Sequence, residues 1–196
     1  MAEPGGCLGA WSGGWLDGAL HRASPNVDER PVGEQISLIV LHSISLPPGM
    51  FGGDEIERLF TNTLDCDAHP YFDQLRSLRV SAHFLIRRDG ALLQFVDCER
   101  RARHAGVSRF GEREACNDFS IGIELEGLEG GLFEAAQYAA LAMLLPRLAA
   151  RYPVAAVAGH EHIAPGRKRD PGPGFDWLRL QALLGWPRER FPFLPG

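Results

Sequence analysis

"ISLIVLH", residues 36–42, is a short and almost continuous apolar run that ends in a histidine. Its length is that of a strand, and its isoleucines and valine are β-branched residues, which favour strands. A run that is apolar on both alternating faces is typical of a strand buried on both sides. We therefore expect residues 36–42 to lie inside a sheet that other elements cover above and below.

Three further stretches predict strands. Residues 83–96, "HFLIRRDGALLQFV", form two strand-like runs about an Arg-Asp-Gly turn, which predicts a hairpin. Residues 154–160, "VAAVAGH", are short and apolar and again end in a histidine. In residues 119–127, "FSIGIELEG", apolar side chains alternate with small and acidic ones. This alternation places Glu124 and Glu126 on one face of a strand.

Helical patterns separate these strands. Asp54 precedes apolar residues at helical spacing and predicts a short helix with an acidic first turn. Residues 133–152 predict a long amphipathic helix, which we expect Pro146 to kink. Residues 175–185 predict a last helix that ends at Gly185. Strands and helices in this order indicate an α/β fold, with a mostly buried sheet and helices packed on its faces.

The length of 196 residues suits a single domain with its own core. Residues 1–34 are rich in glycine and proline and show no periodicity, so we expect an irregular N-terminal segment. We expect the main domain to span residues 35–186 and residues 187–196 to be a C-terminal tail.

The composition excludes several classes of protein. Hydrophobic residues make up 45% and charged residues 23%, as in ordinary globular proteins. The net charge of −5 and the scattered arginines argue against nucleic acid or an anionic membrane as a partner. No apolar run reaches the roughly 18 residues of a membrane span. The first residues lack a secretory pattern, which favours the cytoplasm and reduced thiols for the four separated cysteines.

Two of the predicted strands end in histidine, at His42 and His160, where open sheets present ligand-binding groups. The stretch "GHEHIAPGRKRDPGP", residues 159–173, then supplies Asp170, and its glycines and prolines predict a fixed irregular loop instead of a helix. Two imidazoles and a carboxylate suit one Zn²⁺ with an open fourth position. The alternative for each histidine is a core imidazole bonded to the backbone.

Two more residues complete a set of catalytic groups. Lys168 lies two positions before Asp170, so in an extended segment its ammonium points to the same side and can stabilise a developing oxyanion. Glu124 can take a proton from water and pass it to a leaving nitrogen. These are the parts of a metal-assisted amide hydrolase.

Five blocks in this order resemble the motifs of the AmpD-type N-acetylmuramoyl-L-alanine amidases: "VLHSISLPPGMFGG", "RVSAHFLIRRDG", "HAGVS", "CNDFSIGIELEG" and "GHEHIAPGRKRDPGPGFDW". The resemblance covers roughly residues 15–177. It implies a mixed central sheet with helices on both faces, as in phage amidase lysozymes and peptidoglycan recognition proteins. It also implies a cytoplasmic zinc enzyme of cell-wall recycling, which cuts a 1,6-anhydro-N-acetylmuramoyl peptide between the lactyl group and L-alanine.

Carried over by position, the resemblance implies zinc ligands at His42, His160 and Asp170. It implies a catalytic glutamate at Glu124 and an oxyanion-side lysine at Lys168. Two further positions, Arg79 and His104, are implied to contact substrate, with a surface ion pair as the alternative for Arg79 and structural support as the alternative for His104.

This chain departs from the family at two positions near the substrate. Arg103 stands where the family has a tryptophan, and Ala115 where it often has a basic residue. Glu126 is expected to be a solvated or structural partner, and His83 to give structural support instead of binding a metal. His162 could present to the same side as His160, but the family has a variable residue at this position. These departures concern substrate contacts and not the metal or proton-transfer groups.

Two alternatives to a recycling amidase differ in what they require. A peptidoglycan-binding module without catalysis typically loses a zinc ligand, whereas Asp170 is present here together with Glu124 and Lys168. An exported amidase for polymeric wall needs a signal segment. We expect a monomer whose partner is a small muropeptide.

Overall fold

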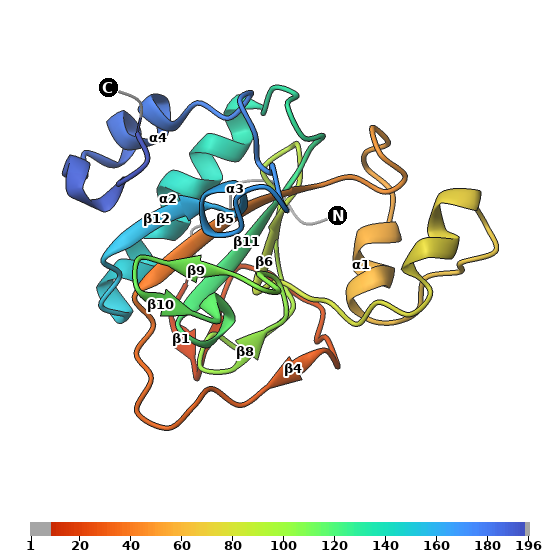
Figure 1. The fold of residues 1–196 in the computed structure, drawn as a ribbon, viewed down its shortest axis with the longest axis horizontal. Helices are drawn as coiled ribbons and strands as arrows, with labels where there is room; N and C mark the ends of the chain where they lie inside the picture. Colours follow the sequence, from red (N-terminus) through yellow and green to blue (C-terminus); the bar gives the residue numbers. More distant parts are fainter. Residues whose placement is uncertain (1–8, 195–196) are drawn as a thin grey trace.

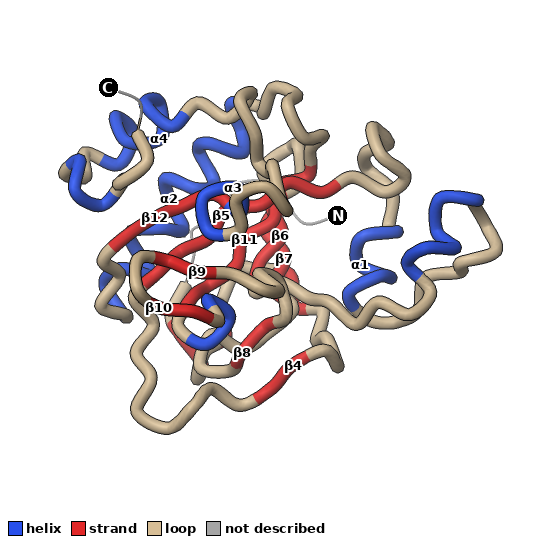
Figure 2. The backbone as a smooth tube through the Cα atoms, in the orientation of Figure 1, coloured by secondary structure: helices blue, strands red, loops and turns tan. Residues whose placement is uncertain are grey.

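The computed structural model describes residues 9–194, which are built around one six-stranded sheet (Figures 1 and 2). In spatial order the strands are β12 (Ala156–Gly159), β5 (Leu38–Ile44), β11 (Ser120–Glu126), β6 (Phe84–Ile86), β7 (Leu92–Gln94) and β3 (Leu20–His21). All neighbours are parallel except β6 and β7, which form the predicted hairpin. The sheet is therefore mixed, as the resemblance implies.

Helices cover both faces of the sheet. On one face, α2 (Ala135–Arg151) packs its leucines against β5 and β11, and α4 (Trp177–Leu184) packs beside it. On the other face lie α1 (Glu55–Phe60), the 3₁₀ helix η1 (Pro70–Leu75) and the short helix α3 (His160–Ile163). Figure 1 shows α1 to the right of the sheet and α4 at its upper left.

The period of two along each strand decides which residues face the site. In β5, Ile39 and Leu41 belong to the core beneath α2, so His42 points to the opposite face. In β11, Ile123 likewise faces α2 and leaves Glu124 on the side of His42. The polar side chains of His42 and Glu124 therefore lie together on the side of the sheet away from α2.

The predicted helices are present. The first begins at Glu55 directly after Asp54, and α2 continues through Pro146. The last, α4, ends at Gly185, which adopts φ of 61° in the left-handed region that favours glycine. Among residues 9–194, no helix is both long and apolar enough to span a membrane.

The N-terminal segment is more ordered than the sequence predicts, although residues 1–8 lie outside the described part. It contains β1 (Trp11–Ser12), β2 (Trp15–Leu16), the edge strand β3 and β4 (Val27–Asp28). The side-chain amide of Gln94 forms the hydrogen bonds that a neighbouring strand would otherwise form with this segment. It accepts from Leu16 N at 2.8 Å and donates to Gly14 O at 2.7 Å. The prediction of a wholly irregular segment is therefore wrong.

Residues 26–30 tie separate parts of the chain together. The Asn26 side chain donates to Val80 O at 2.8 Å, and β4 pairs with β8 (Arg101–Ala102). The Arg30 guanidinium donates to Asp118 O at 2.8 Å and Ser120 O at 2.9 Å. This segment is called the N-terminal strap below.

The remaining short elements complete the description of the chain. They are β9 (Arg109–Phe110), β10 (Arg113–Glu114) and the 3₁₀ helices η2 (Cys116–Asp118) and η3 (Arg188–Arg190). The expected C-terminal tail is in part a packed segment, because Phe191 and Leu194 are buried in the core beneath α4. Within residues 9–194 the cysteines are free thiols, and Cys7 falls outside that range.

Candidate metal centre and active site

Three neighbouring parallel strands bring His160, His42 and Glu124 into a row. Glu124 is the register partner of His42 on the adjacent strand β11. On the other side of β5, Gly159 of β12 pairs with Leu41, so His160 follows directly beside His42. The row lies at the carboxyl ends of these strands, where open sheets bind their ligands.

A short loop returns Asp170 to His160. The stretch expected to be an irregular loop begins with one helical turn, α3, because Ala164 N donates to His160 O at 3.0 Å. The breakers at Pro165 and Gly166 end this turn. Glu161 N then donates to Asp170 O at 2.9 Å and closes the loop. The expectation of no helix is thus wrong for four residues and correct for the rest.

The three predicted ligands converge on one point. His42 Nδ1 lies 2.9 Å from His160 Nδ1, and Asp170 Oδ2 lies 3.1 Å from His160 Nδ1 and 3.3 Å from His42 Nδ1. Both histidines are buried, and the Asp170 side chain is 14% exposed. Burial lowers the pKa of His42 to about 4, so this imidazole is neutral at pH 7.

This donor set fits a zinc ion. Zn–N and Zn–O bonds of about 2.0–2.1 Å in a tetrahedron separate ligand atoms by about 3.3 Å, and the three observed separations are 2.9, 3.1 and 3.3 Å. The imidazole of His160 is oriented from behind, because its Nε2–H donates to Ala105 O at 3.1 Å. Its Nδ1 is therefore available to a metal.

Glu124 is buried without a partner. Its Oε2 forms no hydrogen bond within the described residues, although it is inaccessible to solvent. Burial raises the pKa of this carboxyl well above its ordinary value, and the negative charge of Asp170 raises it further against the opposing charge of Lys168. A carboxyl with these properties is suited to general acid–base chemistry.

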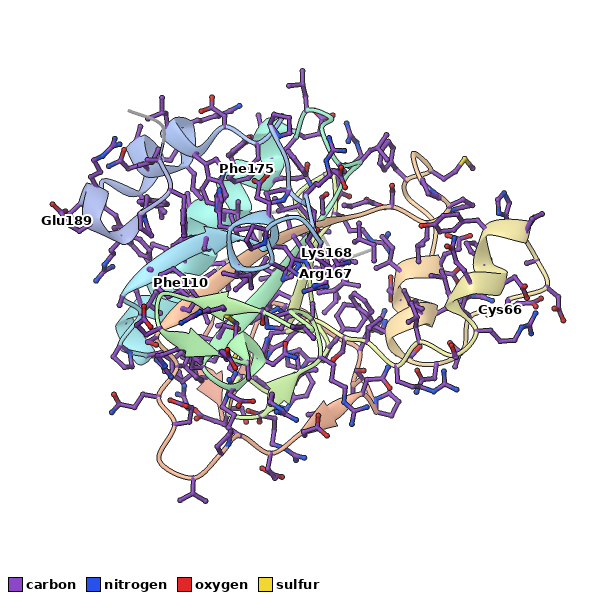
Figure 3. The ribbon with its side chains drawn as sticks, in the orientation of Figure 1. Cys66, Phe110, Arg167, Lys168, Phe175 and Glu189 are labelled. Carbon is purple, nitrogen blue, oxygen red and sulfur yellow. The ribbon has the colours of Figure 1, made fainter. Side chains whose placement is uncertain are left out.

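These groups line a pocket of about 410 Å³. Its polar side carries the three candidate ligands, Glu124 and Lys168, which is exposed and lies next to Arg167 in Figure 3. Its apolar side comes from the end of β5, the loops after β5 and β11, α1, η1 and the segment after η1. The apolar lining includes Ile44, Leu46, Pro48, Leu59, Phe60, Leu75, Leu78, Val80 and Leu128. Arg103 also lines the pocket.

Two residues predicted to contact substrate occupy different surroundings. Arg79 is exposed and does not line this pocket, and its guanidinium donates to the carbonyls of Arg76 and Leu78 at 3.1 and 2.8 Å. His104 does line the pocket, but its ring nitrogens already contact His42 and Ser120. Their contact with substrate stays a prediction.

Glu126, His83 and His162 each accept a hydrogen bond that holds the backbone or a neighbouring side chain. Glu126 accepts from Arg87 at 2.9 Å and from Gly52 N at 2.7 Å. His83 Nδ1 accepts from Gly122 N at 3.0 Å, and His162 Nδ1 accepts from Gly159 N at 2.9 Å.

Sequence reasoning missed three residues that hold the site. Asn117 Oδ1 accepts from the backbone N–H groups of His104 and Ala105. The Arg167 guanidinium donates to Ala105 O at 2.7 Å and joins the two loops that flank the ligands. Ser120 contacts His104. The period of two that places Gly122 and Glu124 on one face includes Ser120 and is a signal that could have found it.

Comparison with known proteins shows the family to which this chain belongs. Residues 32–173 match the family described as N-acetylmuramoyl-L-alanine amidase, and the chain belongs to this family. It is therefore a hydrolase, as the motif blocks imply. The chain is 54% identical over 173 residues to the 1,6-anhydro-N-acetylmuramyl-L-alanine amidase AmpD of Escherichia coli, a match that covers 87% of this chain and 94% of the relative. Identity to AmpD of Salmonella typhimurium (strain SL1344) is 56%, covering 87% and 92%.

Solved structures of related proteins share the fold of this chain. A crystal structure of a selenomethionine AmpD derivative superposes with a TM-score of 0.87 at 54% identity, covering 89% of this chain and 99% of that one. AmpDh3 of Pseudomonas aeruginosa in complex with an anhydromuramic pentapeptide matches with a TM-score of 0.58 at 30% identity, covering 78% and 61%. The fold is shared with the Drosophila peptidoglycan recognition protein SD, with a TM-score of 0.54 at 16% identity, covering 84% and 89%.

Proposed function

We propose that this amidase hydrolyses 1,6-anhydro-N-acetylmuramoyl peptides at the amide between the lactyl group and L-alanine, with one zinc ion per chain. The convergence of two imidazole nitrogens and one carboxylate beside an unpartnered glutamate carries this proposal. The names of the relatives support the substrate, because AmpD of E. coli is a 1,6-anhydro-N-acetylmuramyl-L-alanine amidase.

His42, His160 and Asp170 would hold the ion. When bound, zinc supplies Lewis acidity that brings the pKa of a water molecule close to neutrality. The pocket opens beside Glu124, so this carboxylate takes the proton of the attacking water and delivers it to the leaving nitrogen. Its raised pKa favours the intermediate stage, in which it holds the proton.

Lys168 stabilises the oxygen that becomes negative during the attack. It lines the same pocket, and its exposed ammonium has the flexibility to reach a carbonyl there. Removing one group of this kind from an enzyme typically costs about 100-fold or more in rate.

Substrate binding combines the apolar side of the pocket with one fixed arginine. The Arg103 guanidinium is held by Asp28, with Nε and one terminal nitrogen at 2.8 and 2.7 Å from the two carboxylate oxygens. Its other terminal nitrogen is left for a carboxylate of the stem peptide. The apolar residues of α1 and η1 cover the L-alanine methyl and the sugar.

The size of the pocket favours a small, soluble substrate over polymeric wall. We propose that the enzyme acts as a monomer on muropeptides in the cytoplasm. Mass spectrometry of products from anhydro-muropeptides, reducing-end muropeptides and intact wall tests this. We expect release of the stem peptide from the anhydro substrate, loss of activity on chelation and recovery with zinc. Undiminished cleavage after exhaustive chelation, or no release of the peptide, would overturn the proposal.

A further inference from the structure

A row of buried groups extends from His42 away from the candidate metal site. His42 Nε2 lies 2.9 Å from His104 Nδ1, and His104 Nε2 lies 3.1 Å from Ser120 Oγ. Ser120 Oγ lies 2.5 Å from Cys116 O. His42 and Ser120 are 1% and 0% exposed, so both ends of this row are buried.

The last contact fixes the direction of every hydrogen bond before it. A backbone carbonyl only accepts, so the Ser120 hydroxyl donates its single proton to Cys116 O. Its oxygen must then accept from His104 Nε2–H. The His104 ring nitrogens contact His42 and Ser120 and no carboxylate among the described residues. In a neutral imidazole that carries its proton on Nε2, Nδ1 has no proton. That nitrogen accepts from His42 Nε2–H, which leaves His42 Nδ1 bare.

We propose that Ser120 is a positioning residue that sets the tautomer of His42 through His104 and so presents His42 Nδ1 as the metal-binding nitrogen. The inference rests on the metal site of the proposed function. Ser120 acts on the ligand from two residues away in the row and touches neither substrate nor metal.

The same row is unsuited to carrying protons to or from the site. It ends at a peptide carbonyl, which has no proton to give and is too weakly basic to take one. Its role is therefore orientation. The other ligand is oriented from the neighbouring residue, because Ala105 O accepts from His160 Nε2–H. The neighbouring residues His104 and Ala105 thus orient the imidazoles of both His42 and His160.

The fold reserves space for this arrangement at Gly122. A Cβ at this position would lie 2.4 Å from the His104 ring, well inside contact distance. The absence of a side chain at Gly122 lets the imidazole lie flat against β11 between Ser120 and His42.

Ser120→Ala removes the acceptor for His104 Nε2–H and tests the proposal. Long-range ¹H–¹⁵N NMR on metal-free protein with ¹⁵N-labelled histidine reads the tautomers directly. We expect Nε2–H for both His42 and His104 in the wild type, and a shift of His104 toward Nδ1–H in the variant. Competition with a chelator should show zinc affinity lowered about 10- to 100-fold.

Ser108→Ala is the matched control, because this buried serine accepts from Cys116 N in the same segment without contacting a histidine. It should leave the tautomers and zinc affinity unchanged, and Ser120→Thr, which keeps the hydroxyl, should restore the wild-type tautomers. An Nδ1–H tautomer of His104 in the wild type overturns the inference, even if Ser120→Ala does not fold. Equal losses of zinc affinity in Ser120→Ala and Ser108→Ala overturn it too.

The tautomers are read without zinc or substrate, so failure of the inference differs from failure of the proposed function. A wild-type protein with the expected tautomers that binds no zinc or cleaves no muropeptide contradicts the function alone.

Discussion

Glu124 and His42 are register partners on the adjacent parallel strands β11 and β5, and both side chains lie on the face of the sheet away from α2. The separation of the proposed base from one proposed ligand is therefore set by strand pairing. By contrast, Asp170 and Lys168 are placed by a loop that one backbone hydrogen bond from Glu161 N to Asp170 O closes. Substitutions in the two groups should have different effects.

Asp170→Asn should separate metal binding from stability. The tautomers proposed above leave both imidazole Nδ1 atoms without a proton in the metal-free chain, within 3.3 Å of the Asp170 carboxylate, whereas an amide can donate to one of them. We expect the metal-free variant to unfold at a temperature about 2–4 °C higher than metal-free wild type, which corresponds to roughly 1 kcal/mol in the free energy of unfolding. Added zinc should not raise the unfolding temperature of the variant. Differential scanning fluorimetry with and without zinc measures both. Asp73→Asn, at an exposed position, is the control. A wild-type response to zinc in Asp170→Asn would contradict the assignment.

Glu124→Gln should lose rate and keep the metal. Glu124 Oε2 has no partner to lose among the described residues, so the fold should be unaffected. We expect kcat to fall about 100-fold or more at unchanged zinc content, measured by product release and elemental analysis. Glu126→Gln is the control on the same face, and it should lower the unfolding temperature through its bond to Arg87 while sparing kcat. Loss of zinc from Glu124→Gln would make it a ligand instead of a base.

Arg103→Ala should weaken substrate binding. The guanidinium that Asp28 holds in the pocket is lost, while the metal and proton-transfer groups are untouched. We expect KM for an anhydro-muropeptide to rise about tenfold, or roughly 1.4 kcal/mol, with kcat little changed. Arg109→Ala, on the exposed surface, should leave KM unchanged. Binding of a stem-peptide carboxylate by Arg103 is contradicted if Arg103→Ala raises KM equally for a substrate that has no stem carboxylates.

Asp28→Asn should flatten the acid dependence of stability. The hydrogen bond from Arg103 is the main cause that lowers the pKa of Asp28 from 3.8 to about 2. A carboxylate with a lowered pKa stabilises the fold fully at pH values above its ordinary pKa of 3.8. This contribution to stability is lost as the pH falls toward about 2. Thermal unfolding between these pH values should therefore show a steeper fall for wild type than for Asp28→Asn. Parallel curves would show that the ion pair contributes nothing.

Gly122→Ala should damage both stability and metal binding. The added methyl would lie 2.4 Å from the His104 ring and would push it away from His42. Overpacking of this kind costs about 1–3 kcal/mol, so the unfolding temperature should fall, and zinc affinity should fall with it. Gly111→Ala, whose Cβ would meet nothing within 4 Å but which has φ of 59°, tests for backbone strain alone. A loss of stability without a loss of zinc affinity would separate Gly122 from the metal site.

The sequence predicts the site well wherever the pattern is local. Period-two alternation places Glu124 and Glu126 on one face, and the strand ends identify His42 and His160. The buried run at residues 36–42 becomes the strand β5 between two parallel neighbours. Each of these inferences depends on residues within one element.

The features that sequence reasoning misses depend on distant side chains. The pairing of the N-terminal segment rests on Gln94, which lies 78 residues from its partner Leu16. The tautomer of His42 depends on His104, 62 residues away, and beyond it on Ser120. Spacing along the chain contains no information about such contacts, because folding alone brings these residues together.

The N-terminal strap has a consequence for the order of assembly. Ribosomes release it before nearly all of its partners exist, since Arg30 bonds to Ser120 O, 90 residues further along the chain. Closing contacts of such long range is slow relative to local structure. The contacts of Arg30 with Asp118 and Ser120 can therefore form only after η2 and β11 have been synthesised, later than the contacts of the strap with Val80 and β8.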